Sequence, residues 1–401
     1  MTATLQVGVA ETTINPRSGM QIDGNIGVHR PARFVLSDLH ARAIAFQQGE
    51  RRFLLLSLDL LAITQQWSDA IRDFAAEELG FERDAVAVHV VQNHSSPSMG
   101  QIMLSDRLRA ARKHPWIRGS DPEYGPLAMQ RIRPMLRRAV ESLRPVRVAF
   151  GSALESRVSF NRRIAMRDGT SEMGLRGREQ EALYREGPTD PEVGVAVFTT
   201  EELQTTGALL HHTCHPVHWT PHHAIHADWP GAWARQVRES LLPGTVPLVL
   251  NGCCGNVHHA DALNPHREDT PQSMAGLLTD AARRALAGPY FSDDDPHLAY
   301  DTARFGIPFR ALPQELFDDA HRLIEENPEP LWTDETCTRF EWDWHFAASL
   351  LDLEQTLASQ DALEYEIQAL RLGDLAIVVL PGEPFVEAQL QIKQRSPAAR
   401  T

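Results

Sequence analysis

The sequence VPLVLNGCCGNVHH (residues 246–259) joins an apolar, strand-like run to a polar loop rich in glycine, cysteine and histidine. Three other stretches follow the same plan: VAVHVVQNHSSP (86–97), ALLHHTCHPVH (208–218) and LAIVVLPGEPF (375–385). In α/β sheets, ligand sites form beyond the carboxyl ends of the strands. We therefore expect these four strand ends to meet at one crevice, where histidine, glutamate and amide side chains face one another.

Apolar runs alternate with amphipathic stretches along the chain, and this alternation is typical of the α/β class. The predicted fold is a set of mixed β-sheets flanked by helices. The expected strands are 42–47, 53–60, 86–92, 146–151, 193–199, 207–213, 246–251, 364–371 and 374–380. The expected helices are 67–79, 122–143, 229–241, 272–287, 312–326, 343–358 and 384–394. The loops at 16–37, 101–121 and 163–191 are long, and loops of that length commonly serve a site or move.

The sequence contains no internal repeat and no low-complexity segment. Its best candidate for a boundary is SDDDPH (292–297). We expect residues 1–291 to form the main α/β region. Residues 292–401 would form a second part of the same domain and contribute the strand and helix around Pro-Gly-Glu (381–383).

Bulk properties exclude several classes of protein. The net charge of −14 argues against a nucleic-acid binder, which normally carries a basic stripe, and against attachment to anionic membranes. No signal peptide is visible, and the longest apolar run, FLLLSLDLLAI (53–63), is too short to span a membrane and contains Asp59. The four cysteines form no CxxC pair, which favours a reduced, cytoplasmic protein.

Histidine is the strongest compositional signal, because many of the 18 histidines cluster between residues 211 and 266. His94, His215 and Glu383 follow predicted strands, and two imidazoles with a carboxylate suit zinc while leaving a position open for water. Their spacing matches no short zinc motif, so each of these residues could instead have a structural role. His215 could bond to the backbone, and Glu383 could favour the positive end of a helix dipole. Asp228 could simply cap the helix that follows it.

Ten segments in order carry a family resemblance: VGVAETTINP (7–16), SDLHARAIAF (37–46), LLSLDLLAI (55–63), NHSSP (93–97), SFNRR (159–163), DPEVGV (190–195), TCHP (213–216), ADWPG (227–231), LNGCCGNV (250–257) and LPGEPFVE (380–387). Together they resemble the N-terminal catalytic domain of neutral/alkaline, non-lysosomal ceramidases and their uncharacterised bacterial relatives. The likeness extends over nearly the whole chain. It implies that family's catalytic-domain fold and one zinc ion held by two His, a Glu and a Tyr, where metal-activated water attacks an amide carbonyl.

The resemblance carries over unevenly to individual residues. His215 in TCHP and Glu383 in PGE match zinc ligands of the family. The family motif HTHSGP reads QNHSSP here, so that Gln92 replaces the first histidine and His94 matches the second. Either His94 takes over the ligand role, or the metal is weaker or different. Arg162 in FNRR matches the family arginine near the scissile carbonyl.

Two further departures concern the rest of the site. The family motif GDVSP reads GNVHH (255–259), which places His258 where the family has a serine. The tyrosine ligand belongs to a segment beyond Thr401. Either the natural chain is longer, or another group completes the site. These departures argue against true ceramidase activity more than against hydrolysis.

The resemblance therefore implies a zinc-dependent hydrolase that cleaves a linear amide, or else an ester or glycosidic bond, of an N-acylated small molecule. The long, Arg-rich loops at 101–121 and 163–187 instead favour an anionic or polyhydroxylated substrate over a lipid tail. In this interpretation Arg162 stabilises the oxyanion, His258 or His94 carries the proton, and Asp228 orients His215. The alternative is a degenerate, non-catalytic binding member of the family that has lost its metal. A third reading is a cysteine-dependent hydrolase built on Cys254.

Overall fold

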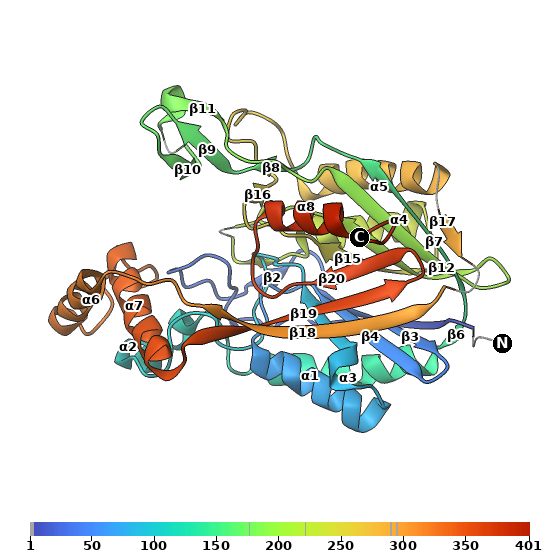
Figure 1. Ribbon diagram of the computed structural model, residues 1–401. Coiled ribbons are helices and arrows are strands. Elements are labelled where there is room, and N and C mark those ends of the chain that lie inside the picture. The colour runs from blue at the N-terminus through green and yellow to red at the C-terminus, as the bar shows by residue number, and fades with distance from the viewer. Residues whose placement is uncertain (1–3, 176, 221, 289–290, 294–295) are drawn as a thin grey trace.

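Two five-stranded mixed sheets pack face to face in the computed structural model, and two helices cover the outer face of each sheet (Figure 1). The structure describes residues 4–175, 177–220, 222–288, 291–293 and 296–401. The result is a four-layer helix–sheet–sheet–helix arrangement, in which each sheet buries one face against the other sheet and one against helices.

The first sheet has the strand order β5 (Val86–Val90), β4 (Arg51–Leu58), β3 (His40–Gln48), β1 (Gln6–Thr13) and β6 (Arg144–Pro145). β4 and β5 are parallel, and the other neighbours are antiparallel. Helix α1 (Gln65–Leu79) makes the crossover that a parallel pair requires, and α3 (Tyr124–Glu141) lies beside it on the outer face.

The second sheet repeats this topology with the order β15 (Val246–Asn251), β13 (Thr205–His212), β12 (Glu192–Thr199), β7 (Arg147–Leu154) and β17 (Phe291–Asp293). Its parallel pair is β13 and β15, joined through α4 (Asp228–Ser240), and α5 (Pro271–Ala287) completes the outer layer. The sequence shows no repeat because the two halves share only an arrangement of strands and helices, while their side chains differ.

The central core lies between the two sheets and is built from large apolar side chains of the inward-facing strand positions. Phe46 of β3 and Phe198 of β12 meet edge to face across it with ring centroids 5.5 Å apart. Both rings are fully buried, and each contributes about 1.5–3 kcal/mol through the apolar surface it removes from water. This core fixes the positions of the carboxyl ends of β5 and β15 relative to each other.

A third, antiparallel sheet of β18 (Leu298–Pro308), β19 (Ala362–Leu372) and β20 (Leu375–Val379) closes one side of the sandwich. Helices α6 (Gln314–Glu326) and α7 (Trp342–Ser359) are inserted between β18 and β19 and project from the body (Figure 1). The loop 101–121 packs against this insertion and contains the short helix α2 (Arg109–Lys113). After β20 the chain passes Glu383 and ends with α8 (Val386–Arg395).

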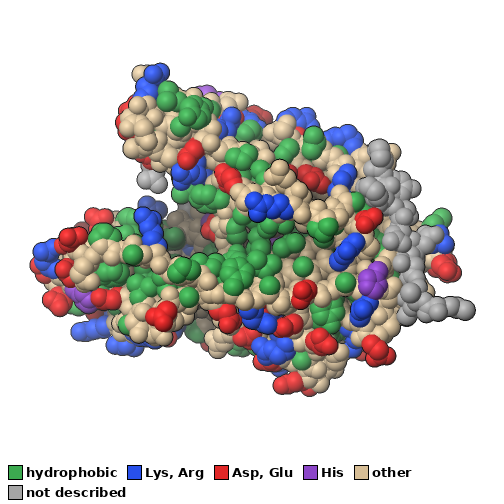
Figure 2. Space-filling view, viewed as in Figure 1, with side chains coloured by type: hydrophobic (Ala, Val, Ile, Leu, Met, Phe, Trp, Pro, Cys, Tyr) green, Lys and Arg blue, Asp and Glu red, His purple; other side chains and the backbone are tan. Residues whose placement is uncertain are grey.

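The segment predicted as a loop at 163–191 forms a small sheet of β9 (Arg163–Met166), β10 (Ser171–Met173) and β11 (Ala182–Arg185). This sheet projects as a second arm, and Figure 2 shows a hollow between it and the arm that carries α6 and α7. Two short strand pairs join loops that are distant in sequence: β2 (Phe34–Val35) pairs with β14 (Ala224–Ile225), and β8 (Phe160–Asn161) pairs with β16 (Val257–His258).

The predicted fold class is confirmed, and all nine predicted strands and seven predicted helices occur within a few residues of the expected bounds. The sequence analysis did not predict β1 and β18. The predicted boundary at SDDDPH includes residues 294 and 295, which lie outside the described residues, so the division at 291 stays a prediction. Among the residues that the structure describes, no helix is long and apolar enough to cross a bilayer.

Candidate metal centre

The four strand ends singled out in the sequence meet at one place, as expected. The backbone amide of His94, after β5, donates to the carbonyl of Pro216. The amide of His215, after β13, donates to the carbonyl of Val257. The amide of Gly255, after β15, donates to the carbonyl of Pro384. These bonds join the loops of β5, β13, β15 and β20 into one unit.

The loop after β5 is held by a buried amide side chain. Asn93 donates from Nδ2 to the carbonyls of His226 and Asp59, and its Oδ1 accepts from the amide of Ser95. Gln92 has a φ of 66°, in the left-handed region that side chains other than glycine seldom adopt. This turn directs the next residues away from the strand axis and presents the His94 side chain to the site.

His94 is fixed by a contact with the loop at 16–37. Its Nδ1 donates to the carbonyl oxygen of Gly24 at 2.7 Å, while its Nε2 is buried and has no hydrogen-bond partner among the described residues. Gly24 is required there because a Cβ at this position would lie 2.8 Å from the His94 ring. Burial lowers the pKa of His94 to about 4, and the nearby His215 adds to the effect, so the imidazole is neutral at pH 7.

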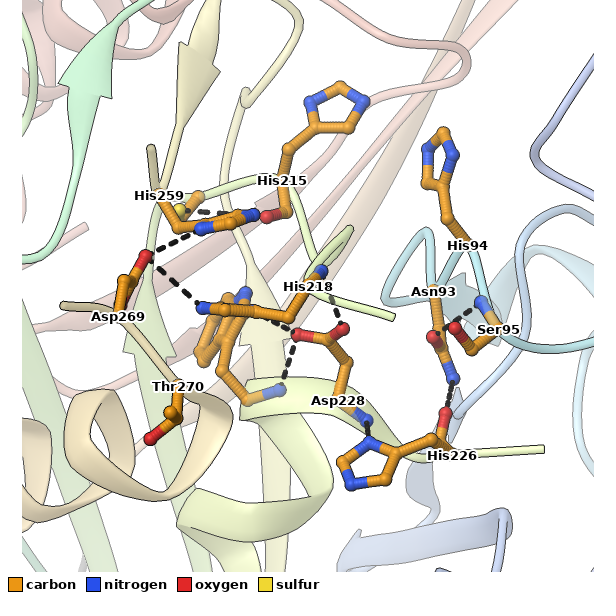
Figure 3. Close-up of polar contacts among 12 residues, drawn as sticks. Asn93, His94, Ser95, His215, His218, His226, Asp228, His259, Asp269 and Thr270 are labelled. Atoms are coloured by element: carbon orange, nitrogen blue, oxygen red, sulfur yellow. Dashed lines mark hydrogen bonds and ion pairs between the residues drawn. The ribbon is translucent and has the colours of Figure 1, made fainter. Parts of the chain in front are cut away.

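His215 has the same tautomer and a similar support. Its Nδ1 donates to the carbonyl of Cys254 at 2.8 Å, and its Nε2 lies 2.8 Å from Oε1 of Glu383. Its side chain is 2% exposed, and its ring centroid lies 5.2 Å from that of His94. Figure 3 shows the two imidazoles side by side above the loops that carry them. Histidine ligands of metals usually have one ring nitrogen fixed in this way, which frees the other.

Glu383 is the more accessible member of the group, with a side chain that is 44% exposed. Burial would raise its pKa, but the hydrogen bond and charge of His215 outweigh burial and hold the pKa below its usual range. The carboxylate is therefore ionised at neutral pH. Glu383 lies on the turn between β20 and α8. Gly255 packs so closely against this turn that a Cβ on Gly255 would lie 2.4 Å from the Glu383 carbonyl oxygen.

These three residues fit a zinc ion by donor type and by tautomer. Within the part of the chain that the structure describes, however, their ligand atoms do not all lie within 4.8 Å of one another. One shared ion therefore requires a rotation of the His94 or Glu383 side chain. The turn that carries Glu383 is exposed enough to allow it. The role of His94, His215 and Glu383 as ligands stays a prediction.

Gln92 and Cys254 form a contact beside the group, because Sγ of Cys254 lies 2.9 Å from Oε1 of Gln92. Burial raises the pKa of the Cys254 thiol far above its usual range, and the charge of Glu383 raises it further. A thiol in this state is protonated at neutral pH and is a poor nucleophile. This environment argues against a cysteine-dependent hydrolase.

Arg162 and His258 lie on the other side of His215. Arg162 donates from Nη2 to the carbonyl of Gly255, and its buried Nε has no partner among the described residues. Its charge contributes to the lowered pKa of both Glu383 and His258. Burial lowers the pKa of His258 to about 2, and the neighbouring His259 and His215 add to this effect. His258 is therefore a neutral imidazole whose proton-carrying role stays a prediction.

The expected partnership of Asp228 with His215 is wrong. Asp228 lies at the start of α4 with a φ of 49°, is fully buried, and accepts a 2.6 Å hydrogen bond at Oδ1 from Nδ1 of His218 (Figure 3). Its carboxylate also accepts from the amides of His218 and Trp229. The left-handed backbone turns the side chain toward His218, while the carbonyl of Cys254 supports His215. Asp228 therefore orients a different histidine.

A cavity of about 650 Å³ adjoins the centre. Gln92, Cys254 and Glu383 are among its lining residues. Apolar side chains of the facing strands, including Val90, Leu250 and Ile377, make up much of the wall. The wall also contains charged side chains such as Arg72 and Lys393, so the cavity is mixed in character.

One residue beside the candidate ligands was not predicted from the sequence, and two were noticed only as part of the histidine cluster. Asp269 was not singled out, because no motif surrounds it. His218 and His259 belong to the histidine cluster but carried no assigned role. In the structure these three lie together beside the candidate ligands (Figure 3). The density of histidines between residues 211 and 266 was the only signal for them.

Comparisons with known proteins place the fold. No family model matches the sequence, and no curated protein matches it. Among solved structures, the neutral ceramidase from Pseudomonas aeruginosa aligns with a TM-score of 0.67 and 16% identity over 98% of this chain. A structure described as a ceramidase complexed with C2 aligns with a TM-score of 0.69 and 17% identity, also over 98% of this chain. The chain spans 64% and 65% of the lengths of those two proteins. It therefore has the neutral-ceramidase fold over nearly its whole length.

Proposed function

We propose that this chain is a zinc-dependent hydrolase that cleaves the amide bond of an N-acylated small molecule. One observation carries the proposal. His94 and His215 each fix Nδ1 on a backbone carbonyl, which leaves Nε2 of His94 without a partner among the described residues and directs Nε2 of His215 at Oε1 of Glu383, 2.8 Å away. Two imidazole nitrogens and one carboxylate oxygen form the donor set of many catalytic zinc sites, which keep a fourth position open.

Zinc bound there would polarise the substrate carbonyl and lower the pKa of a water molecule. The side chains around it have separate tasks. Glu383 is ionised and supplies the negative charge that balances the ion. Arg162, beside Glu383 and His258, donates to the oxygen of the amide carbonyl as negative charge develops on it. The carbonyls of Gly24 and Cys254 hold the two rings in position.

The cavity next to Glu383 supports an acyl substrate over a wholly polar one. Its apolar side chains would accept a hydrocarbon chain, and its polar and charged lining residues, among them Arg72, His211 and Lys393, offer partners to the polar part of the substrate. The amide bond would then lie near Gln92 and Glu383. Of the substrate classes considered from the sequence, the N-acylated class fits this shape best.

The test combines zinc analysis with an activity screen. Purified protein is stripped with a chelator, reloaded with zinc and assayed on a series of N-acyl amides of increasing chain length. We expect zinc-dependent hydrolysis that improves with acyl length. His215→Ala should abolish turnover and zinc binding at this centre, while the melting temperature of the metal-free variant stays near that of the metal-free wild type, because one strand-end side chain contributes little to the core. His266→Ala, which removes an exposed histidine, is the matched control.

A binding protein without catalysis is the second candidate. Gln92 in place of a family histidine, together with the wide spacing of the three ligand atoms, favours it. Stoichiometric binding of N-acyl amides without zinc and without hydrolysis would support this alternative. Activity that His215→Ala leaves intact would contradict the proposed hydrolase.

A further inference from the structure

A second group of metal-type side chains lies beside the candidate centre and shares no residue with it. His218 follows the TCHP loop, His259 follows β16, and Asp269 immediately precedes α5. One ligand atom from each lies within 4.8 Å of the other two. Figure 3 shows Asp269 facing both imidazoles, whose rings stack with centroids 3.6 Å apart.

The orientation of His218 is set from behind by a carboxylate. Its Nδ1 donates to Oδ1 of Asp228 at 2.6 Å, so its Nε2 faces Asp269, 3.4 Å from Oδ2. Asp228 is itself held by the amides of His218 and Trp229 and has no freedom to turn. A carboxylate bonded to one nitrogen of an imidazole, with the other nitrogen directed at a ligand position, is the usual support of a metal-binding histidine.

Three polar atoms of this group are buried without a hydrogen-bond partner among the described residues. They are Nε2 of His218, Nε2 of His259 and Oδ1 of Asp269. The side chains are 3%, 11% and 9% exposed, respectively. A buried polar atom without a partner costs about 1–3 kcal/mol, and this cluster contains three of them. A cation that accepts lone pairs from one imidazole nitrogen of each histidine and from the Asp269 carboxylate would replace the proton that Nδ1 of His259 shares with Oδ2 of Asp269.

The remaining contacts of Asp269 are compatible with such a ligand. Its Oδ2 accepts from Nδ1 of His259 at 2.5 Å and lies 3.5 Å from Nη1 of Arg267. With Asp228, the pocket contains two carboxylates, which outweigh burial and raise the pKa of His218 to about 9. An ion bound to Nε2 of His218 would take the place of that proton between the two carboxylates.

We propose that His218, His259 and Asp269 bind a second divalent ion of the zinc type. Two imidazole nitrogens and one carboxylate oxygen match zinc, with water as the fourth ligand. His259 and Asp269 belong to the loop 259–269 and His218 to the loop after β13, so the ion joins these two loops. Its role is to hold these segments together. His258 separates it from the first centre, with its ring 4.4 Å from His259 and 6.4 Å from His215.

The test counts zinc by elemental analysis after exhaustive dialysis, in the wild type and in single variants. We expect about two ions per chain in the wild type and about one in each of His215→Ala and His259→Gln. His266→Ala, an exposed histidine of the same loop, should keep both ions. If the first centre binds no zinc, the wild type should hold a single ion that His259→Gln removes and His215→Ala does not. The two proposals can therefore fail separately.

Thermal melts supply a readout that does not depend on activity. Zinc should raise the melting temperature of the chelator-treated wild type and of chelator-treated His215→Ala. The increase that remains in His215→Ala comes from the second site, so His259→Gln should lack that part of the increase. Should His259→Gln fail to fold, Asp269→Asn, which keeps the side-chain shape, takes its place in both measurements. The proposal would be overturned if His259→Gln and Asp269→Asn had the same zinc content as the wild type and the same zinc-dependent increase in melting temperature. That result would show that the cluster holds a water molecule, or that a protonated His218 pairs with its two carboxylates.

Discussion

Replacing Gly24 with alanine tests whether the position of His94 matters to the centre. A Cβ on Gly24 would lie 2.8 Å from Cα, Cγ and Nδ1 of His94. To reach ordinary van der Waals contact, His94 must move by about 0.6 Å, its Cα together with its ring, which weakens the 2.7 Å bond between Nδ1 and the Gly24 carbonyl. The φ of +87° adds strain of about 1–2 kcal/mol for any residue with a side chain.

Gly19→Ala is the matched control for this change. Gly19 lies in the same loop with a φ of +90°, but a Cβ there would meet nothing within 4 Å. The two variants therefore share the backbone strain and differ in the contact with His94. We expect both to lose about 1–2 kcal/mol of unfolding free energy in chemical denaturation. Only Gly24→Ala should also lose zinc affinity and about 10- to 100-fold in kcat/KM, because a shift of this size in a reacting group is costly. Equal zinc affinity and equal kcat/KM in the two variants would refute the assigned position of His94.

Three other predictions concern Arg162, Cys254 and His212. Arg162→Ala should lower kcat by about 10²- to 10³-fold with unchanged zinc content, the usual cost of losing an oxyanion donor, and an unchanged kcat would remove Arg162 from that role. Cys254→Ala should keep kcat within about tenfold, because the thiol is buried and protonated, and a loss beyond about 10⁴-fold would revive the cysteine mechanism. Burial lowers the pKa of His212 to about 4, so the unfolded chain binds a proton that the folded chain rejects between pH 6.5 and 4. Stability should therefore be complete above pH 6.5 and fall by up to about 3 kcal/mol toward pH 4, and His212→Gln should flatten this slope in denaturant titrations.

The predicted elements with strong apolar runs all occur, and the two long strands that were not predicted have a common weakness. β18 is mostly exposed along its length, so its sequence, LAYDTARFGIP, lacks a buried stripe that periodicity could reveal. β1 has the sequence QVGVAETT, in which small residues blur the alternation. Both strands depend on partners distant in sequence for their place in a sheet, and pairing of that kind leaves little local signal.

The candidate centre was predictable to the level of loops, and the contacts within it were not. The strand-end rule correctly brought His94, His215 and Glu383 to one place. The partner of Asp228 could not be inferred, because a left-handed backbone at one residue decides which histidine its carboxylate meets. The support of His94 by Gly24 spans 70 residues of sequence. Such contacts arise from tertiary packing, which spacing along the chain does not encode.

Anomalous diffraction from crystals of the zinc-loaded protein, collected on both sides of the zinc absorption edge, would locate the ion at the candidate centre. We expect a zinc peak about 2.0–2.1 Å from Nε2 of both His94 and His215, with a carboxylate oxygen of Glu383 completing the protein ligands. Zinc-loaded crystals without a peak between these two imidazoles would contradict this expectation, even if a peak occurred at His218, His259 and Asp269.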